Sequence, residues 1–146
     1  MGLFRRRKRR ITRLLVVEDE PLIAFDNEYA LKQADFEIVA TVDNAEQAHP
    51  FIDPEQIDAA VLDVGLAGEA SGLDIASIAR ARDIPVLFVT GSCPDGARDY
   101  AYGCLNKPYL PGDLVAAIEA IDCILRGEAP KSVPAGLTLF VDAAAA

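Results

Sequence analysis

Three acidic residues and one lysine stand where apolar, strand-like runs end. Glu18 and Asp19 come directly after one such run, Asp63 after another, and Lys107 after a third. Because the carboxyl ends of parallel strands converge on one crevice in an open α/β sheet, we expect these side chains to share one site. Clustered carboxylates raise each other's pKa unless a cation neutralises them. A hard ion such as Mg²⁺ suits this oxygen-only cluster, and Mg²⁺ beside a lysine is suited to binding a phosphoryl group.

The elements that must position these residues alternate along the chain. Apolar or β-branched runs predict strands at 14–17, 37–41, 58–62, 85–89 and 103–106. Helical patterns follow them at 20–34, 44–52, 73–82, 97–102 and 111–126. The fourth helix is the weakest prediction, because Pro94 and Gly96 leave it short and poorly capped. Five strand–helix units predict the α/β class, with a doubly wound five-stranded parallel sheet and helices on both faces.

Four short motifs each lie at the end of a predicted strand, and together they indicate a family. They are VEDEP at 17–21, LDV around Asp63, FVTG at 88–91 and the Lys107-Pro108 pair. In this order they make residues 12–126 resemble the receiver domain of two-component response regulators. The resemblance implies a flavodoxin-like sheet of strand order 2-1-3-4-5, with its ligand site between the first and third strands.

The same resemblance divides the chain into three parts. Residues 1–11 would form a basic N-terminal arm, residues 12–127 the receiver domain and residues 128–146 a C-terminal tail. The tail ends in a short apolar run and is too short for a second domain.

The resemblance also implies a role for each residue in phosphoryl transfer. Asp63 would be the phosphoacceptor, because a carboxylate can attack a phosphoryl donor and form an aspartyl phosphate. Lys107 and the Thr90 hydroxyl would then donate hydrogen bonds to phosphoryl oxygens. The peptide bond before Pro108 is cis in the family, and we expect it to be cis here.

The expected metal site consists of oxygen donors. Glu18, Asp19 and Asp63 would bind Mg²⁺ together with the backbone carbonyl of Gly65, the position to which the family's backbone ligand maps. We expect Asp19 to contact the ion directly and Glu18 to act through a water molecule, because Mg²⁺ needs only one or two direct carboxylates.

One departure from the family lies three residues before the lysine. Receivers usually carry a Tyr or Phe there that moves when the threonine binds the phosphoryl group, and this chain has Cys104. The FVTG motif partly resembles the F-A-T-G motif of an atypical receiver subgroup known from alphaproteobacteria. We expect Cys93, Cys104 and Cys123 to be separate small thiols in a reducing compartment, because three is an odd number and no C-x-x-C pair occurs.

Composition bounds the class of protein. The 146 residues are 51% hydrophobic and 25% charged, which is typical of one globular domain. No apolar run has the length of a membrane span, and no signal-peptide pattern follows the basic N-terminus, so we expect a cytoplasmic protein. Seven of the 14 basic residues lie in the first 13 positions, before any of the 23 acidic ones. This arm could bind nucleic acid, a membrane surface or an acidic partner, or it could fold back on the acidic remainder of the chain. The acidic charge of that remainder argues against DNA binding by the domain itself.

These patterns predict a single-domain response regulator rather than an enzyme. It would accept a phosphoryl group on Asp63 from a histidine kinase, and then act through a partner protein or serve as a phosphate sink. Two alternatives remain. One is a pseudo-receiver that docks without phosphorylation, which the intact Asp63, Thr90 and Lys107 disfavour. The other is a phosphohydrolase of the haloacid-dehalogenase type, disfavoured because Glu18 stands where its nucleophile would be and no cap insertion is present.

Overall fold

The computed structural model describes residues 9–65 and 72–141. Most of the predicted basic arm (1–8) and the end of the predicted tail (142–146) therefore lie outside the described residues. No helix within the described ranges is long and apolar enough to cross a membrane.

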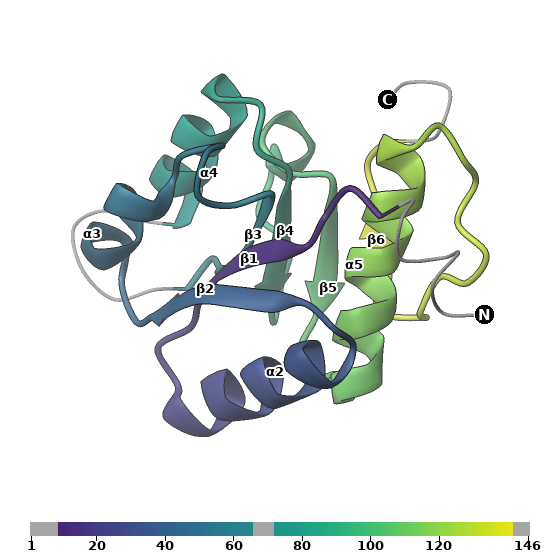
Figure 1. The fold of residues 1–146 in the computed structure, drawn as a ribbon, viewed down its shortest axis with the longest axis horizontal. Coiled ribbons are helices and arrows are strands. Elements are labelled where there is room, and N and C mark those ends of the chain that lie inside the picture. Colours follow the sequence, from purple (N-terminus) through teal and green to yellow (C-terminus); the bar gives the residue numbers. More distant parts are fainter. Residues whose placement is uncertain (1–8, 66–71, 142–146) are drawn as a thin grey trace.

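A single six-stranded sheet forms the centre of the molecule, with strand order β2-β1-β3-β4-β5-β6 (Figure 1). Its strands are β1 (Arg13–Val17), β2 (Glu37–Val42), β3 (Ala59–Asp63), β4 (Val86–Thr90), β5 (Gly103–Asn106) and β6 (Leu137–Leu139). Neighbouring strands from β2 to β5 pair in parallel. The predicted α/β fold with order 2-1-3-4-5 is confirmed, and β6 extends it by one strand.

Helices cover both faces of the sheet. They are α2 (Pro21–Gln33), α3 (Ala45–Ala48), α4 (Gly72–Ala81) and α5 (Pro111–Leu125), with a 3₁₀ turn at His49–Phe51. Side chains alternate between faces along a strand, so Leu15 and Val17 of β1 pack in one core with α3 and α4, whereas Leu14 and Val16 pack in another with α2 and α5 (Figure 1). Apart from Arg13, Asp63 and Thr90 at their ends, the central strands β1, β3 and β4 are apolar, because both of their faces are buried.

The sixth strand comes from the segment predicted as a tail. β6 pairs antiparallel with β5, setting Leu137 opposite Leu105 and Leu139 opposite Gly103. Leu137 is buried, and a side chain at Gly103 would bring its Cβ within 3.0 Å of the Thr138 carbonyl oxygen. β6 therefore covers the edge that β5 would otherwise expose.

The crossover from β4 to β5 differs from the prediction of a helix at 97–102. Residues 91–102 are all described, and their only helical segment is a 3₁₀ turn at Ala97–Asp99. Gly96 precedes this turn with a positive φ of 77°. The predicted helix was wrong. Gly96 provides no side-chain cap for it, whereas the short helix α3 is capped by the side chain of Asn44.

The outward face of α2 is unusually apolar. Leu22, Phe25 and Tyr29 are apolar, yet all three are exposed to solvent, with Leu22 at 82%. The helix packs inward through Asn27 and Leu31 instead.

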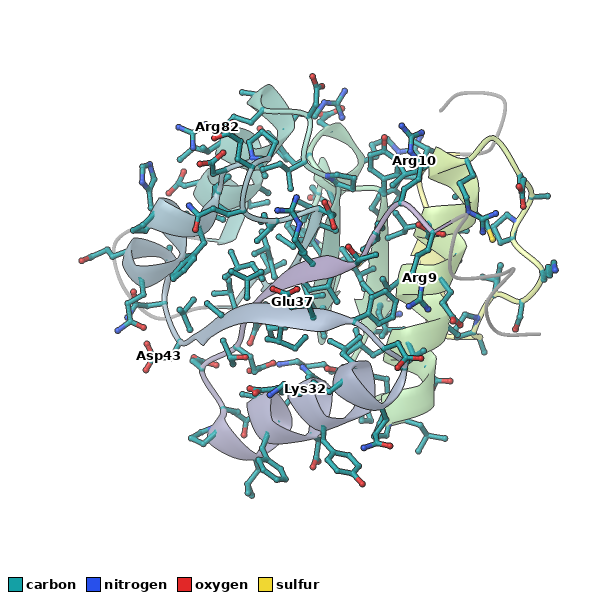
Figure 2. The ribbon with its side chains drawn as sticks, viewed as in Figure 1. Arg9, Arg10, Lys32, Glu37, Asp43 and Arg82 are labelled. Atoms are coloured by element: carbon teal, nitrogen blue, oxygen red, sulfur yellow. A yellow bond between two sulfur atoms is a disulfide. The ribbon has the colours of Figure 1, made fainter. Side chains whose placement is uncertain are left out.

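The described end of the basic arm lies against the domain. Ile11 is fully buried, and the backbone N–H groups of Arg10 and Ile11 donate to Asp122 Oδ1 at 2.7 and 2.8 Å. Arg9 contacts Glu119 through Nη2 at 3.2 Å (Figure 2). Arg9 and Arg10 thus lie on the acidic surface of α5. The boundary between a basic arm and the receiver domain at residues 11 and 12 stays a prediction.

Candidate functional site

The predicted site residues converge at the carboxyl edge of the parallel strands. Glu18 directly follows β1, Asp63 is the last residue of β3, Thr90 is the last residue of β4, and Lys107 follows β5. β1, β3, β4 and β5 are neighbours in the sheet, so their ends open on one crevice.

Three carboxylates form the acidic part of this site. One oxygen from each of Glu18, Asp19 and Asp63 lies within 4.8 Å of the others. Glu18 and Asp63 are buried, at 3% and 7% exposure, whereas Asp19 is exposed. Such an oxygen-only cluster with one side open to water fits a hard divalent cation that keeps part of its hydration shell.

Lys107 lies across two of these carboxylates. Its Nζ is 3.0 Å from Glu18 Oε1 and donates a hydrogen bond to Asp63 Oδ2 at 3.1 Å. Burial raises the pKa of Glu18 above its ordinary value, although the hydrogen bond from Lys107 opposes this. Burial alone would lower the pKa of Lys107, but its contacts with Glu18 and Asp63 outweigh burial and raise it. The lysine therefore stays protonated and partly neutralises the acidic cluster.

The backbone around Asp63 is closely packed. Asp63 Oδ1 accepts a hydrogen bond from the Gly65 N–H at 2.9 Å. A Cβ at Gly72 would lie 2.9 Å from the Asp63 carbonyl oxygen, so the start of α4 can approach β3 only as glycine. The structure thus brings Gly65 to the site, while metal coordination by its carbonyl stays a prediction.

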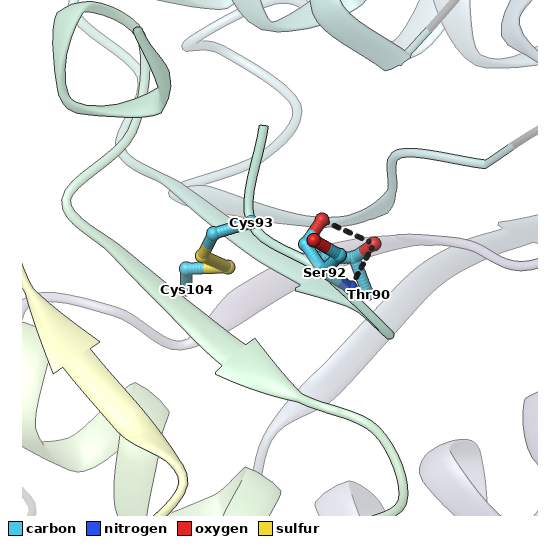
Figure 3. Close-up of a disulfide and its surroundings, with 4 residues drawn as sticks. All are labelled: Thr90, Ser92, Cys93 and Cys104. Carbon is cyan, nitrogen blue, oxygen red and sulfur yellow. Dashed lines mark hydrogen bonds between the residues drawn. A yellow bond between two sulfur atoms is a disulfide. The ribbon is translucent and has the colours of Figure 1, made fainter. Parts of the chain in front are cut away.

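Thr90 reaches the same edge, but its hydroxyl is engaged within its own loop. Thr90 Oγ1 donates to the Ser92 carbonyl oxygen at 3.1 Å and accepts from the Ser92 N–H at 3.3 Å (Figure 3). The Thr90 carbonyl accepts from the Lys107 N–H at 2.8 Å, which joins the ends of β4 and β5. The Lys107–Pro108 peptide is cis, as the resemblance implies.

A second polar contact near the site was not predicted. The Tyr109 hydroxyl donates to Asn27 Oδ1 at 2.8 Å and thereby links α2 to the loop that carries Lys107. Burial raises the pKa of Tyr109 to about 12. The sequence gives one hint of this contact, because Asn27 lies on the helix face opposite the apolar residues Leu22 and Phe25.

The cysteines contradict the expectation of three separate thiols. Cys93, in the loop after β4, and Cys104, in β5, form a disulfide with their Cα atoms 6.3 Å apart (Figure 3). Cys123 remains free. Spacing in the sequence could not reveal this pair, because Cys93 and Cys104 come together only when the chain between β4 and β5 folds back against the sheet.

Comparison with known proteins identifies the family. The family model for the response regulator receiver domain matches residues 14–119. The transcriptional regulatory protein KdpE of Staphylococcus aureus is 28% identical over 131 residues, covering 84% of this chain and 54% of that protein. The transcriptional regulatory protein PdtaR of Mycobacterium tuberculosis is 33% identical over 113 residues, covering 73% and 55%. The chain thus spans about half the length of these curated relatives.

Solved structures show the same fold. A response regulator receiver protein from Sinorhizobium medicae superposes with a TM-score of 0.64 at 24% identity, covering 74% of this chain and 91% of that one. The response regulator PhyR from Brucella abortus gives a TM-score of 0.62 at 31% identity, covering 76% and 47%. With its acidic cluster, its lysine and the family match over residues 14–119, this chain belongs to the response regulator receiver domain family.

Proposed function

We propose that this chain accepts a phosphoryl group on Asp63 from the phosphohistidine of a histidine kinase. The observation that carries the proposal is the contact of Lys107 with both Glu18 and Asp63 beside the exposed Asp19. This arrangement collects negative charge where a metal ion can neutralise it, and it holds a cation against the residue that must attack.

The residues around Asp63 would divide the work of the transfer. An Asp63 carboxylate oxygen forms the new bond to phosphorus as the phosphorus–nitrogen bond of the phosphohistidine breaks, and the electron pair stays on the histidine nitrogen. Mg²⁺, held by Glu18, Asp19, Asp63 and the Gly65 carbonyl, would supply charge neutralisation for the incoming phosphoryl oxygens. The Gly65 N–H orients Asp63 Oδ1.

Lys107 and Thr90 would respond once the phosphoryl group is in place. Lys107 already donates to Asp63 Oδ2, and a phosphoryl oxygen offers it a stronger acceptor. The Thr90 hydroxyl has one proton to donate, so binding a phosphoryl oxygen would release its bond to the Ser92 carbonyl. The loop after β4 is therefore the part of the domain whose hydrogen bonds phosphorylation would change first.

The output is proposed to be non-enzymatic. Acting in the cytoplasm as a single-domain regulator, the protein would signal through a partner protein or compete as a phosphate sink, and the acidic domain itself would not bind DNA. The partly matching FVTG motif supports placing it in the F-A-T-G subgroup. The basic arm would add a contact with a membrane surface or an acidic partner.

The test is labelling of wild-type protein, Asp63→Asn and the control Asp95→Asn. Asp95 is an exposed aspartate in the β4–β5 crossover, so its loss leaves the acidic cluster intact. With Mg²⁺ and a phosphorylated kinase or a small phosphodonor, wild type and Asp95→Asn should acquire an acyl phosphate, and Asp63→Asn should not. Labelling that survives in Asp63→Asn would overturn the assignment of the acceptor. A folded wild type that accepts no phosphoryl group from either donor would favour the pseudo-receiver.

A further inference from the structure

The Cys93–Cys104 disulfide closes the one crossover of the parallel sheet that carries no α-helix. Cys104 lies in β5 opposite Phe88 of β4 and is fully buried. Cys93 lies in the loop after β4, three residues beyond Thr90. The bond therefore ties a loop without an α-helix to β5, a strand that is paired on both sides within the sheet (Figure 3).

The two cysteine residues differ in their exposure to solvent. Cys104 is fully buried, whereas Cys93 is partly exposed. Thiol–disulfide exchange requires a thiolate to reach a sulfur atom, so an external thiol would attack Cys93 and displace Cys104. In a reducing compartment such as the cytoplasm, disulfides that do occur are usually transient and redox-sensing.

The loop that the bond restrains is the one that holds the Thr90 hydroxyl. Ser92, which both donates to and accepts from Thr90 Oγ1, is the residue directly before Cys93. For Thr90 to donate elsewhere, its hydroxyl must release the Ser92 carbonyl oxygen, and the tether at Cys93 limits how far the backbone of Ser92 can move away. Reduction removes that covalent restraint and leaves the two hydrogen bonds between Thr90 and Ser92 and the packing of Cys93 against the core.

We propose that Cys93 and Cys104 form a thiol–disulfide exchange site whose oxidised form holds Thr90 on Ser92 and weakens the response of the domain to a phosphoryl group. The coupling to phosphorylation rests on the function proposed above for Asp63. The co-reactant is a low-molecular-weight disulfide in the oxidising direction and a dithiol, small or protein-borne, in the reducing direction.

The oxidising reaction balances in two exchanges. The Cys93 thiolate attacks the small disulfide, forming a mixed disulfide and releasing one small thiolate. The Cys104 thiolate then attacks the Cys93 sulfur, which forms the internal bond and releases the second small thiolate. Two electrons pass from the protein to the small disulfide, and the two cysteine protons end on the released thiols. A dithiol reverses both steps and is itself oxidised to a disulfide.

The experiment compares the full chain after treatment with glutathione disulfide and after treatment with dithiothreitol. Mass spectrometry establishes the Cys93–Cys104 bond, and amide hydrogen exchange over residues 90–105 is measured without any phosphoryl mimic. Exchange in this segment should be faster in the reduced protein. Beryllofluoride with Mg²⁺ is then titrated against each form. We expect half-saturation at a concentration about tenfold lower in the reduced protein, which corresponds to about 1.4 kcal/mol, the scale of one net hydrogen bond.

Matched cysteine variants identify the source of any difference. Cys93→Ser should behave as the reduced protein under both treatments, and Cys104→Ala serves as the second variant that cannot form the bond. Cys123→Ser should retain the full redox difference, because Cys123 remains free. A redox difference that disappears in Cys123→Ser but persists in Cys93→Ser would overturn the assignment.

The outcomes separate the two proposals. Identical amide exchange over residues 90–105 in the oxidised and reduced proteins would overturn the redox site, even if beryllofluoride binds normally. Equal or tighter beryllofluoride binding in the oxidised form would overturn its inhibitory direction. Beryllofluoride that binds neither form would count against the phosphoryl-accepting function, and the exchange comparison would still decide whether the disulfide restrains the loop.

Discussion

Replacing Lys107 by methionine removes a cation that contacts both buried carboxylates of the acidic cluster. The lysine Nζ lies 3.0 Å from Glu18 Oε1 and 3.1 Å from Asp63 Oδ2. The side chain of Glu18 is only 2% exposed and that of Asp63 only 9%, so water cannot fully replace the lost ammonium group. Methionine keeps most of the side-chain volume, so the change is chiefly one of charge.

The expected loss of stability lies between two limits. An exposed ion pair contributes at most about 1 kcal/mol, whereas removing one partner of a fully buried pair costs about 3–5 kcal/mol. Lys107 is 20% exposed and its two partners are buried. We therefore expect Lys107→Met to lower the free energy of unfolding by about 2 kcal/mol at neutral pH without Mg²⁺.

The loss should depend on pH through Glu18. Burial already raises the pKa of this carboxyl, and removing the lysine hydrogen bond that opposes burial should raise it further. A glutamate with a raised pKa keeps its proton in the native state at pH values where the unfolded chain has released it. Stability therefore falls as the pH rises from the ordinary glutamate pKa through the raised one, and the deficit of Lys107→Met should shrink on acidification.

Urea unfolding tests these expectations. Wild type, Lys107→Met, Glu18→Gln and the double variant would be compared at neutral pH and at about pH 4.5, with and without Mg²⁺. The cost of Lys107→Met should be smaller in the Glu18→Gln background, because only Asp63 then loses its partner. Mg²⁺ should restore part of the loss. Lys32→Met is the matched control, since Lys32 forms an exposed helical pair with Glu28 and should cost no more than about 0.5 kcal/mol.

Two results would refute this reasoning. Wild-type stability of Lys107→Met at neutral pH without Mg²⁺ would mean that the carboxylates do not need the lysine. A deficit of equal size at both pH values and in the Glu18→Gln background would mean that the loss comes from packing rather than charge.

Two further predictions concern stability outside the site. Burial alone would raise the pKa of Asp58, but hydrogen bonds from Arg13 and Thr12 outweigh burial and lower this pKa to about 2. The stability that the ionised Asp58 contributes is therefore present above its ordinary pKa and is lost as the pH falls through about 2. Unfolding measured between about pH 5 and pH 2 should show about 1 kcal/mol less acid-induced loss in Asp58→Asn than in wild type, and equal loss would contradict the assignment. Leu137→Ala should cost about 2 kcal/mol in urea unfolding, because Leu137 is buried on β5. Val133→Ala, at a position 48% exposed, should change stability by no more than about 0.5 kcal/mol, and equal costs would exclude a structural role for β6.

The position of the site could be predicted from the sequence because its signal is local. Glu18, Asp63 and Lys107 each follow an apolar run whose length and composition indicate a buried strand. Parallel strands all point their carboxyl ends the same way, so residues at these ends lie along one edge of the sheet, and the strand order decides which of them are neighbours. The sheet order and the roles of the residues came from the resemblance, and metal coordination and phosphoryl transfer stay predictions.

Other features depend on contacts between distant segments and carry no local signal. Asn27 and Tyr109 are 82 residues apart in the chain. An asparagine on a helix has no preferred partner until α2 and the loop after β5 are packed together. The sixth strand is similar, since the short run at Leu137–Leu139 is a strand only because β5 offers an edge that must be covered.

Tertiary structure likewise decided the state of the cysteines. An odd number of cysteines with no close pair indicates free thiols, and it was the crossover from β4 that placed Cys93 within bonding distance of Cys104. That crossover has a 3₁₀ turn where a helix was predicted, and the Gly96 before it provides no side-chain cap. Residue types and their periodicity therefore determined which side chains lie at the strand ends. The packing of helices and loops against the sheet determined which residues distant in the sequence come into contact.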